Sequence, residues 1–355
     1  MLESLLTVST IDIAGRAALL FLSFQAAWKL SSWADPRNEF HRTKENSFDP
    51  HSAAGHRQYR FNADRKLWLR TRWWLPPAST EWKGVIFIVH GYNEHIERYH
   101  YCGTKLAENG YAVFGIDHQG HGLSEGERLY VERFEHYEHD YIEFVRDTLA
   151  LTSDSAHVKE SMMHFPDGLK LASLPRFLLG HSMGSLISLQ LIHNHSELQW
   201  NGAIMCSGAF QVDPKAISPI EMALSSILSV VLPKFRPPNP SLSVVKDRSE
   251  HERSLRDSFN YKTGPTMRWA GEFIEAMKRA PALMPSIHTP LLIFHGENDA
   301  VTPLAGSKTL YEKASSSVKE LRLMPNMFHE LIHDSCRDDM LDEIITWCDQ
   351  RRDIL

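Results

Sequence analysis

The sequence is poor in cysteine and in net charge, and both shortages restrict what the protein can be. Its 355 residues include 4 cysteines, none of which form a Cys-x-x-Cys pair. A zinc ribbon is therefore excluded, and a disulfide framework is not expected in a chain this long. The 44 acidic and 38 basic residues leave a net charge of −6. No nucleic-acid partner is expected, because neutralising phosphates needs clustered Lys and Arg.

The sequence also lacks a dinucleotide-binding motif and the high apolar content of a polytopic membrane protein. No Gly-x-Gly-x-x-Gly follows a predicted strand, so nothing indicates a dinucleotide cofactor. The hydrophobic share of 43% is enough for a large core but does not resemble a polytopic membrane protein.

The first thirty residues are the exception to this composition. Residues 2–30 are mostly apolar, but the densest stretch, Ala17–Trp28, lies between Arg16 and Lys29. It is shorter than the roughly 20 residues that span a bilayer. A secretory signal fits poorly, because the first fifteen residues carry two acids and no Lys or Arg. A membrane anchor, a cleaved targeting segment and a helix packed on the protein all remain open. An anchor would make the protein intracellular and membrane-associated.

From about residue 57 onward, short β-branched runs alternate with amphipathic helical patterns. Strands are predicted at 57–61, 67–74, 85–89, 111–116, 177–179, 203–206, 291–294 and 320–323. Helices are predicted at about 97–108, 132–150, 183–193, 304–314 and 337–351. This alternation predicts an α/β fold, a mostly parallel central sheet flanked by helices, with the first two strands forming a hairpin.

The alternation is interrupted once, between residues 207 and 286, by a proline-rich segment and at least two helical patterns. The simplest interpretation is an insertion or lid. We therefore expect an N-terminal segment and linker over 1–45, a core formed by 46–208 and 286–355, and a helical cap over 209–285.

The strongest chemical signal is Gly180-His181-Ser182-Met183-Gly184. It follows a predicted strand and opens a predicted helix, the context in which Gly-x-Ser-x-Gly forms a nucleophile elbow. Glycine is needed on both sides because a side chain there would collide with the neighbouring backbone. The serine then projects at the carboxyl edge of the sheet, beside a helix N-terminus that favours negative charge. We predict Ser182 as a nucleophile.

A nucleophilic serine needs a base, and the base needs an orienting acid. In this fold the expected chain order is serine, acid, histidine, with each partner after a later strand. Asp299 and His329 lie at those two places, with Glu297 as the rival acid and His333 as the rival base.

An oxyanion hole needs two N–H groups aimed at the developing negative charge. One is expected from Met183, the residue after the nucleophile. The other is expected from the loop 90–95, after the first parallel strand, where Tyr92 is the predicted donor.

The segment His329–His333 also matches the zinc-peptidase pattern His-Glu-x-x-His. On a helix the two histidines would share a face and bind zinc, with Glu330 as general base. The metzincin extension would require a third histidine where the chain has Asp339. The segment also falls where the serine mechanism needs its base. Zinc chemistry therefore stays an alternative, and no metal or cofactor is expected.

With these residues assembled, the chain from about Arg57 to its end resembles the monoglyceride lipase family of α/β-hydrolases. The resemblance is carried by His90–His95 with Arg98 and Tyr99, Asp117–Gly126, Gly180–Gly184, Val231–Pro233 and His295–Asp299. It implies an α/β-hydrolase fold with a helical cap, a triad of Ser182, Asp299 and His329, and an oxyanion hole from Tyr92 and Met183.

The resemblance also implies that Glu94 and Arg98 shape the polar alcohol end of the pocket. A loop-stabilising ion pair between these two residues is the alternative. Some family members carry a second histidine three residues after the catalytic one, where this chain has Ile332. Recognition of glycerol is therefore less firmly indicated than ester hydrolysis.

The activity implied by the resemblance is serine hydrolysis of lipophilic carboxylic esters, most directly monoacylglycerol to fatty acid and glycerol. A lysophospholipase, another small carboxylesterase or a transacylase would use the same triad. A non-catalytic scaffold that binds a lipid or a partner protein is the alternative from another class. Residues 220–232 are apolar on most faces, and part of this stretch must pack on the core. The resemblance implies that the exposed part contacts lipid or lines an acyl tunnel. The expected partners are a lipid ester and a membrane surface.

Overall fold

The computed structural model describes residues 58–213, 219–237, 244–261 and 264–353. The N-terminal segment for which the sequence predicts membrane contact lies outside these residues. Among the residues described, no helix combines the length and the apolar character needed to cross a membrane.

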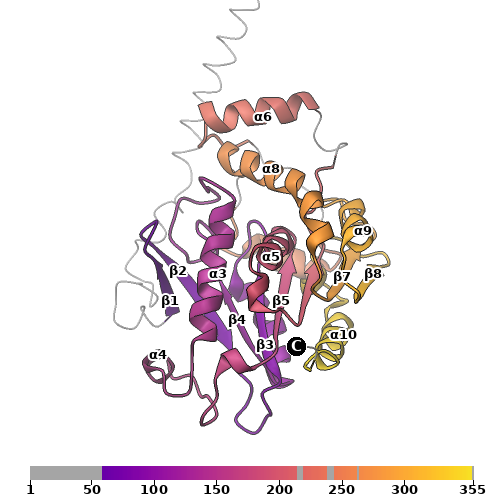
Figure 1. Cartoon of the computed structure of the whole chain (residues 1–355). Coiled ribbons are helices and arrows are strands. Elements are labelled where there is room, and N and C mark those ends of the chain that lie inside the picture. The colour runs from indigo at the N-terminus through magenta and orange to yellow at the C-terminus, as the bar shows by residue number, and fades with distance from the viewer. Residues whose placement is uncertain (1–57, 214–218, 238–243, 262–263, 354–355) are drawn as a thin grey trace, which may run out of the picture.

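An eight-stranded sheet with the order β1-β2-β4-β3-β5-β6-β7-β8 forms the centre of the molecule (Figure 1). Its strands are β1 (Tyr59–Asn62), β2 (Leu67–Trp74), β3 (Gly84–Val89), β4 (Tyr111–Ile116), β5 (Arg176–His181), β6 (Gly202–Cys206), β7 (Leu291–Gly296) and β8 (Lys319–Met324). The antiparallel β1–β2 pair is the predicted hairpin, and β2 pairs antiparallel with β4. All pairs from β4 to β8 are parallel. The predicted mostly parallel sheet is confirmed.

Helices cover both faces of this sheet because its central strands are apolar on both sides. In β3, Val85 and Phe87 point into one core and Ile86 and Ile88 into the other. The first core is covered by α3 (Glu135–Leu149), α5 (Met183–Asn194) and α9 (Leu304–Lys313), and the second by α2 (His100–Glu108) and α10 (Arg337–Asp349). The remaining short helices are η4 (Ile96–Tyr99), α4 (Ala156–Glu160), η5 (Leu171–Ser173), η6 (Ser196–Leu198), η7 (Met284–Ser286) and η8 (Leu331–His333).

In the described part of the chain between β6 and β7, where the sequence predicts a cap, the α-helices are α6 (Pro219–Val231), α7 (Arg248–Arg256) and α8 (Met267–Leu283). Thr266 begins α8 as its N-cap, its side chain accepting a hydrogen bond from Trp269 N at 3.2 Å. Helix α8 packs on α5 of the core and on α6. Gly271 permits close packing of α8 on α6, since a Cβ there would lie 2.8 Å from the Cβ of Ser229. Because α8 lies between α5 and α6, helix α6 is farther from the sheet than α8 (Figure 1).

Candidate active site

Ser182 sits on a sharp, strained turn between β5 and α5. Its φ of 53° and ψ of −116° lie in a region that non-glycine residues rarely adopt. The turn is held by Ser182 N, which donates to Cys206 O at 2.9 Å. Glycine is required at Gly184 because a Cβ there would lie 1.8 Å from Val89 O. The local geometry is that of the predicted nucleophile elbow.

The predicted acid and base come together at the same edge of the sheet. Asp299 follows β7, His329 follows β8, and His329 Nδ1 lies 2.8 Å from Asp299 Oδ2. A carboxylate oxygen only accepts, so Nδ1 carries the proton and Nε2 is the ring's proton acceptor. The rival acid, Glu297, is exposed, and the rival base, His333, faces a different carboxylate.

The charge state of Asp299 suits an orienting acid. Burial alone would raise the pKa of this carboxyl. The charge and hydrogen bond of His329, helped by the Thr302 backbone N–H, instead hold the pKa well below its ordinary range. Asp299 is therefore an anion at neutral pH and can stabilise a protonated His329.

The predicted oxyanion loop approaches the serine directly. A Cβ at Gly91 would lie 3.1 Å from the Cβ of Ser182, so the chain passes closer than a side chain would allow. Tyr92 follows Gly91 on this loop, and Met183 is the first residue of α5, where backbone N–H groups have no partner within the helix. The ring of His181, next to the serine, lies 5.0 Å from the ring of His329.

Glu94 stabilises this loop through its side chain, which contacts Gly91 N. Its side chain is 3% exposed and its two oxygens are surrounded by donors. Oε1 contacts Gly91 N, His181 Nδ1 at 2.8 Å and Tyr99 Oη at 2.9 Å, and Oε2 contacts His333 Nε2 at 3.3 Å and Arg98 at 3.4 Å. Burial would raise the pKa of the Glu94 carboxyl, but His181 above all, with His333 and Arg98, keeps the pKa well below its ordinary value.

Comparison with known proteins identifies the family of this chain. The model of a family described as serine aminopeptidase, S33 matches residues 80–336. A monoglyceride lipase from Rattus norvegicus is 30% identical over 293 residues, which cover 82% of this chain and 89% of the relative. A monoacylglycerol lipase from Mycolicibacterium smegmatis is 27% identical over 77% of this chain and 90% of its own length. The chain belongs to the monoglyceride lipase-like family.

The α/β-hydrolase fold of this family is confirmed by a solved structure. A soluble variant of monoglyceride lipase from Saccharomyces cerevisiae, in complex with a substrate analog, superposes with a TM-score of 0.69. The match covers 83% of this chain and 95% of the yeast chain at 20% identity. As a member of the monoglyceride lipase-like family, the protein is a serine hydrolase.

In this monoglyceride lipase-like chain, Glu94 and Arg98 form the ion pair that the sequence left as an alternative. Arg98 binds Glu330 more closely, at 2.5 Å, and reaches Glu250 of α7 at 3.7 Å. Arg98 also lines a cavity of about 290 Å³ beneath α7. A contact of either residue with an alcohol group stays a prediction. The partners His181 and Tyr99 were not predicted, because the sequence pattern does not indicate which side chains Glu94 faces.

The His-Glu-x-x-His pattern does not bring its histidines together. Residues 331–333 form a single 3-10 turn rather than an α-helix. His329 faces Asp299, whereas His333 faces Glu94. The two histidines therefore bind separate carboxylates and do not converge on one ion.

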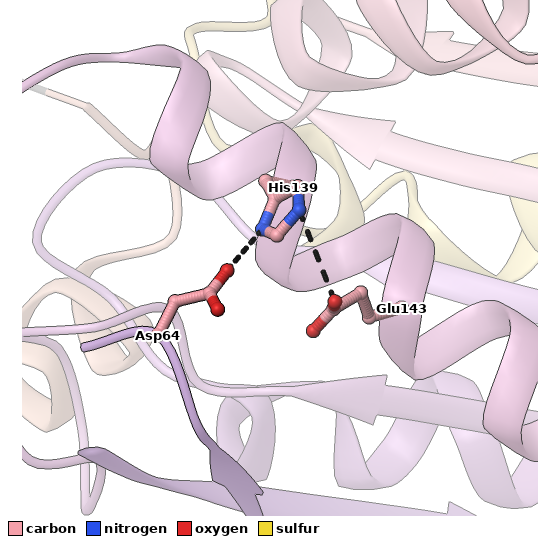
Figure 2. A group of neighbouring side chains, drawn as sticks. All are labelled: Asp64, His139 and Glu143. Atoms are coloured by element: carbon pink, nitrogen blue, oxygen red, sulfur yellow. Dashed lines mark ion pairs between the residues drawn. The ribbon is translucent and has the colours of Figure 1, made fainter. Parts of the chain in front are cut away.

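Among the described residues, Asp64, His139 and Glu143 form the one group whose ligand atoms lie close enough to share a metal ion. Figure 2 shows His139 of α3 between Asp64 of the β1–β2 turn, at 3.9 Å, and Glu143, at 3.8 Å. The other oxygen of Glu143 binds the guanidinium of Arg60 at 2.8 Å. With a cation already beside it and most of its atoms exposed, the group is a surface ion-pair cluster.

Proposed function

We propose that this chain hydrolyses monoacylglycerols to a fatty acid and glycerol through an acyl-enzyme at Ser182. The observation that carries the proposal is the buried Asp299–His329 pair, with its contact of 2.8 Å, beside a serine on a strained elbow. Relatives named monoglyceride lipase and monoacylglycerol lipase support the substrate class.

In the first half of the reaction, His329 Nε2 removes the Ser182 hydroxyl proton as Oγ attacks the ester carbonyl. Asp299 holds Nδ1–H and stabilises the imidazolium that forms. The N–H groups of Tyr92 and Met183 bind the carbonyl oxygen as it becomes negative. Collapse breaks the ester C–O bond, and His329 gives its proton to the leaving alcohol.

In the second half, water takes the place of the alcohol. His329 removes a proton from that water, which attacks the acyl-enzyme carbonyl, and the same two N–H groups bind the second oxyanion. The bond to Ser182 Oγ breaks, the serine is reprotonated and the fatty acid leaves. We assign the acyl end of the site to the cap.

We further propose that residues 209–285 act as the cap and that its outer helix touches a lipid surface. Leu224, Ile227, Val230 and Val231 of α6 are between 51% and 70% exposed. The first three are spaced three residues apart and share one face of the helix. Exposed apolar side chains gathered on one helix face favour lipid contact, which would bring the site to substrate dissolved in a membrane.

Replacement of the nucleophile tests the proposed reaction. Ser182→Ala should abolish covalent labelling by a fluorophosphonate probe and reduce monoacylglycerol hydrolysis by at least about a thousandfold. Both proteins are assayed on monoacyl-, diacyl- and lysophospho-glycerols. Stoichiometric labelling of Ser182→Ala would refute the nucleophile. A wild-type preference for lysophospholipid over monoacylglycerol would refute the substrate.

Replacement of the outer cap residues tests the lipid contact. Leu224→Ser combined with Ile227→Ser should weaken binding to phosphatidylcholine vesicles about tenfold. The two serines can no longer transfer apolar side-chain surface from water into the lipid. Hydrolysis of a soluble p-nitrophenyl ester should not change. Met162→Ser is the matched control, since Met162 is 74% exposed near α4, at the opposite end of the molecule from α6 (Figure 1). Equal vesicle binding by all three proteins would contradict the proposal.

A further inference from the structure

The carboxylate of Asp299 receives more donors than a triad acid needs. Its Oδ1 accepts from the backbone N–H groups of Val301 at 2.8 Å and Thr302 at 3.0 Å. Its Oδ2, the oxygen that binds His329, also lies 2.8 Å from Thr302 Oγ1 and 3.4 Å from His295 Nε2. Two side chains outside the triad thus converge on the oxygen that orients the base.

The hydroxyl proton of Thr302 has two candidate acceptors. Thr302 Oγ1 also lies 3.3 Å from His329 Nδ1, but that nitrogen carries a proton and cannot accept. Besides Asp299 Oδ2 at 2.8 Å, Thr302 Oγ1 lies 3.1 Å from the carbonyl oxygen of Ser207. Both are acceptors only, and a hydroxyl has a single proton. The shorter, charge-assisted contact is the stronger one, so the hydroxyl donates to Asp299.

The proton on His295 can be assigned in the same way. His295 Nε2 lies 3.2 Å from the carbonyl oxygen of Thr302, which only accepts, so Nε2 carries the proton. Burial lowers the pKa of the His295 imidazole, so the ring is neutral and Nδ1 accepts from Ser307 Oγ at 2.8 Å. The Nε2–H of His295 therefore donates to the Thr302 carbonyl oxygen, and the ring lies 3.4 Å from Asp299 Oδ2 without placing a positive charge beside it.

We propose that Thr302 is a positioning residue of the triad: its hydroxyl fixes Asp299 Oδ2 against His329. The proposal rests on the proposed function, since it assigns Asp299 and His329 to the reaction. The two backbone N–H groups hold only Oδ1. Without the hydroxyl, the carboxylate can turn about its Cβ–Cγ bond and misdirect the imidazole. Small displacements of catalytic groups cost large factors in rate.

Variants at position 302 test this role. Thr302→Val keeps the branched shape and removes the hydroxyl, whereas Thr302→Ser keeps the hydroxyl. We expect Thr302→Val to lower kcat between about tenfold and a hundredfold with KM unchanged, and Thr302→Ser to restore most of the loss. The matched control is Thr309→Val on α9, whose hydroxyl binds only Ala305 O of its own helix and should leave kcat unchanged.

Two further measurements separate positioning from folding. Active-site titration with a fluorophosphonate counts competent molecules, so kcat is expressed per folded site, and Thr302→Ala repeats the hydroxyl deletion without a second methyl group. The downfield proton resonance of His329 Nδ1–H should shift in Thr302→Val but not in Thr302→Ser. Wild-type kcat per site in both Thr302→Val and Thr302→Ala would overturn the proposal, as would equal losses in Thr302→Val and Thr302→Ser. Absence of labelling in the wild type would instead refute the proposed function.

Discussion

Two buried carboxylates flank Ser182, and their surroundings differ in one decisive way. Asp299 and Glu94 are both enclosed, both have a pKa held below the ordinary value, and both face histidines. Asp299 binds His329 through Nδ1, which leaves Nε2 as a base for the serine. His181, the closest histidine to Glu94, has no comparable arrangement. His181 uses its second nitrogen for the carbonyl oxygen of His329, at 3.3 Å.

This difference indicates that the two carboxylates have different roles, one in proton transfer and the other in holding the loop 90–95. In the proposed mechanism, His329 on the Asp299 side presents a proton acceptor to the reacting atoms. On the other side, Glu94 links the predicted oxyanion loop to η4, because it contacts both Gly91 N of that loop and Arg98 of η4. A buried carboxylate beside a nucleophile is thus not by itself a sign of proton transfer, because the position of its partners' second nitrogen decides the role.

Loss of the charge on Asp299 should give the largest effect. In Asp299→Asn the amide favours the wrong tautomer of His329, so kcat for monoacylglycerol should fall about ten-thousandfold with little change in thermal stability. Steady-state kinetics and a melting curve measure both quantities. Glu297→Gln, at the exposed rival acid two residues away, is the control and should retain wild-type kcat. A loss smaller than tenfold in Asp299→Asn would remove Asp299 from the mechanism.

Much of the Asp299 side could be predicted from the sequence, because chain order and strand ends determine it. The motif around Ser182 follows a strand, and Asp299 and His329 follow two later strands. Parallel strands bring their carboxyl ends to one edge. Strand positions were also predictable, since short β-branched runs buried on both faces have a distinct pattern.

The Glu94 side could not be predicted, for a physical reason. Glu94 lies on an irregular loop, where spacing along the chain does not determine the direction of a side chain, unlike in a helix or strand. The sequence therefore left a pocket contact and an ion pair with Arg98 as equal alternatives. The same limit applies to Thr302, whose hydroxyl reaches Asp299 only because the loop after β7 folds back on itself. His333 appeared only as a rival base, although it is a partner of Glu94.

Loss of the charge on Glu94 should act first on stability and less on rate. Glu94→Gln removes one partner from a buried ionic network and should cost about 3 kcal/mol of unfolding free energy at pH 7. The kcat should fall far less than in Asp299→Asn, because the triad keeps its charges. Urea unfolding of the wild type, Glu94→Gln and the control Glu297→Gln measures the difference.

The pH dependence of that difference identifies the charge as its source. Glu94 has a pKa well below the ordinary 4.5 in the folded protein, so its stabilising contribution is complete above pH 4.5. The contribution is lost progressively as the pH falls toward the folded value. The gap in unfolding free energy between wild type and Glu94→Gln should therefore narrow as the pH falls below 4.5. A gap that does not change with pH would mean that Glu94 contributes by shape and neutral hydrogen bonding. In that case, only the difference in kcat between the variants would distinguish the role of Glu94 from that of Asp299.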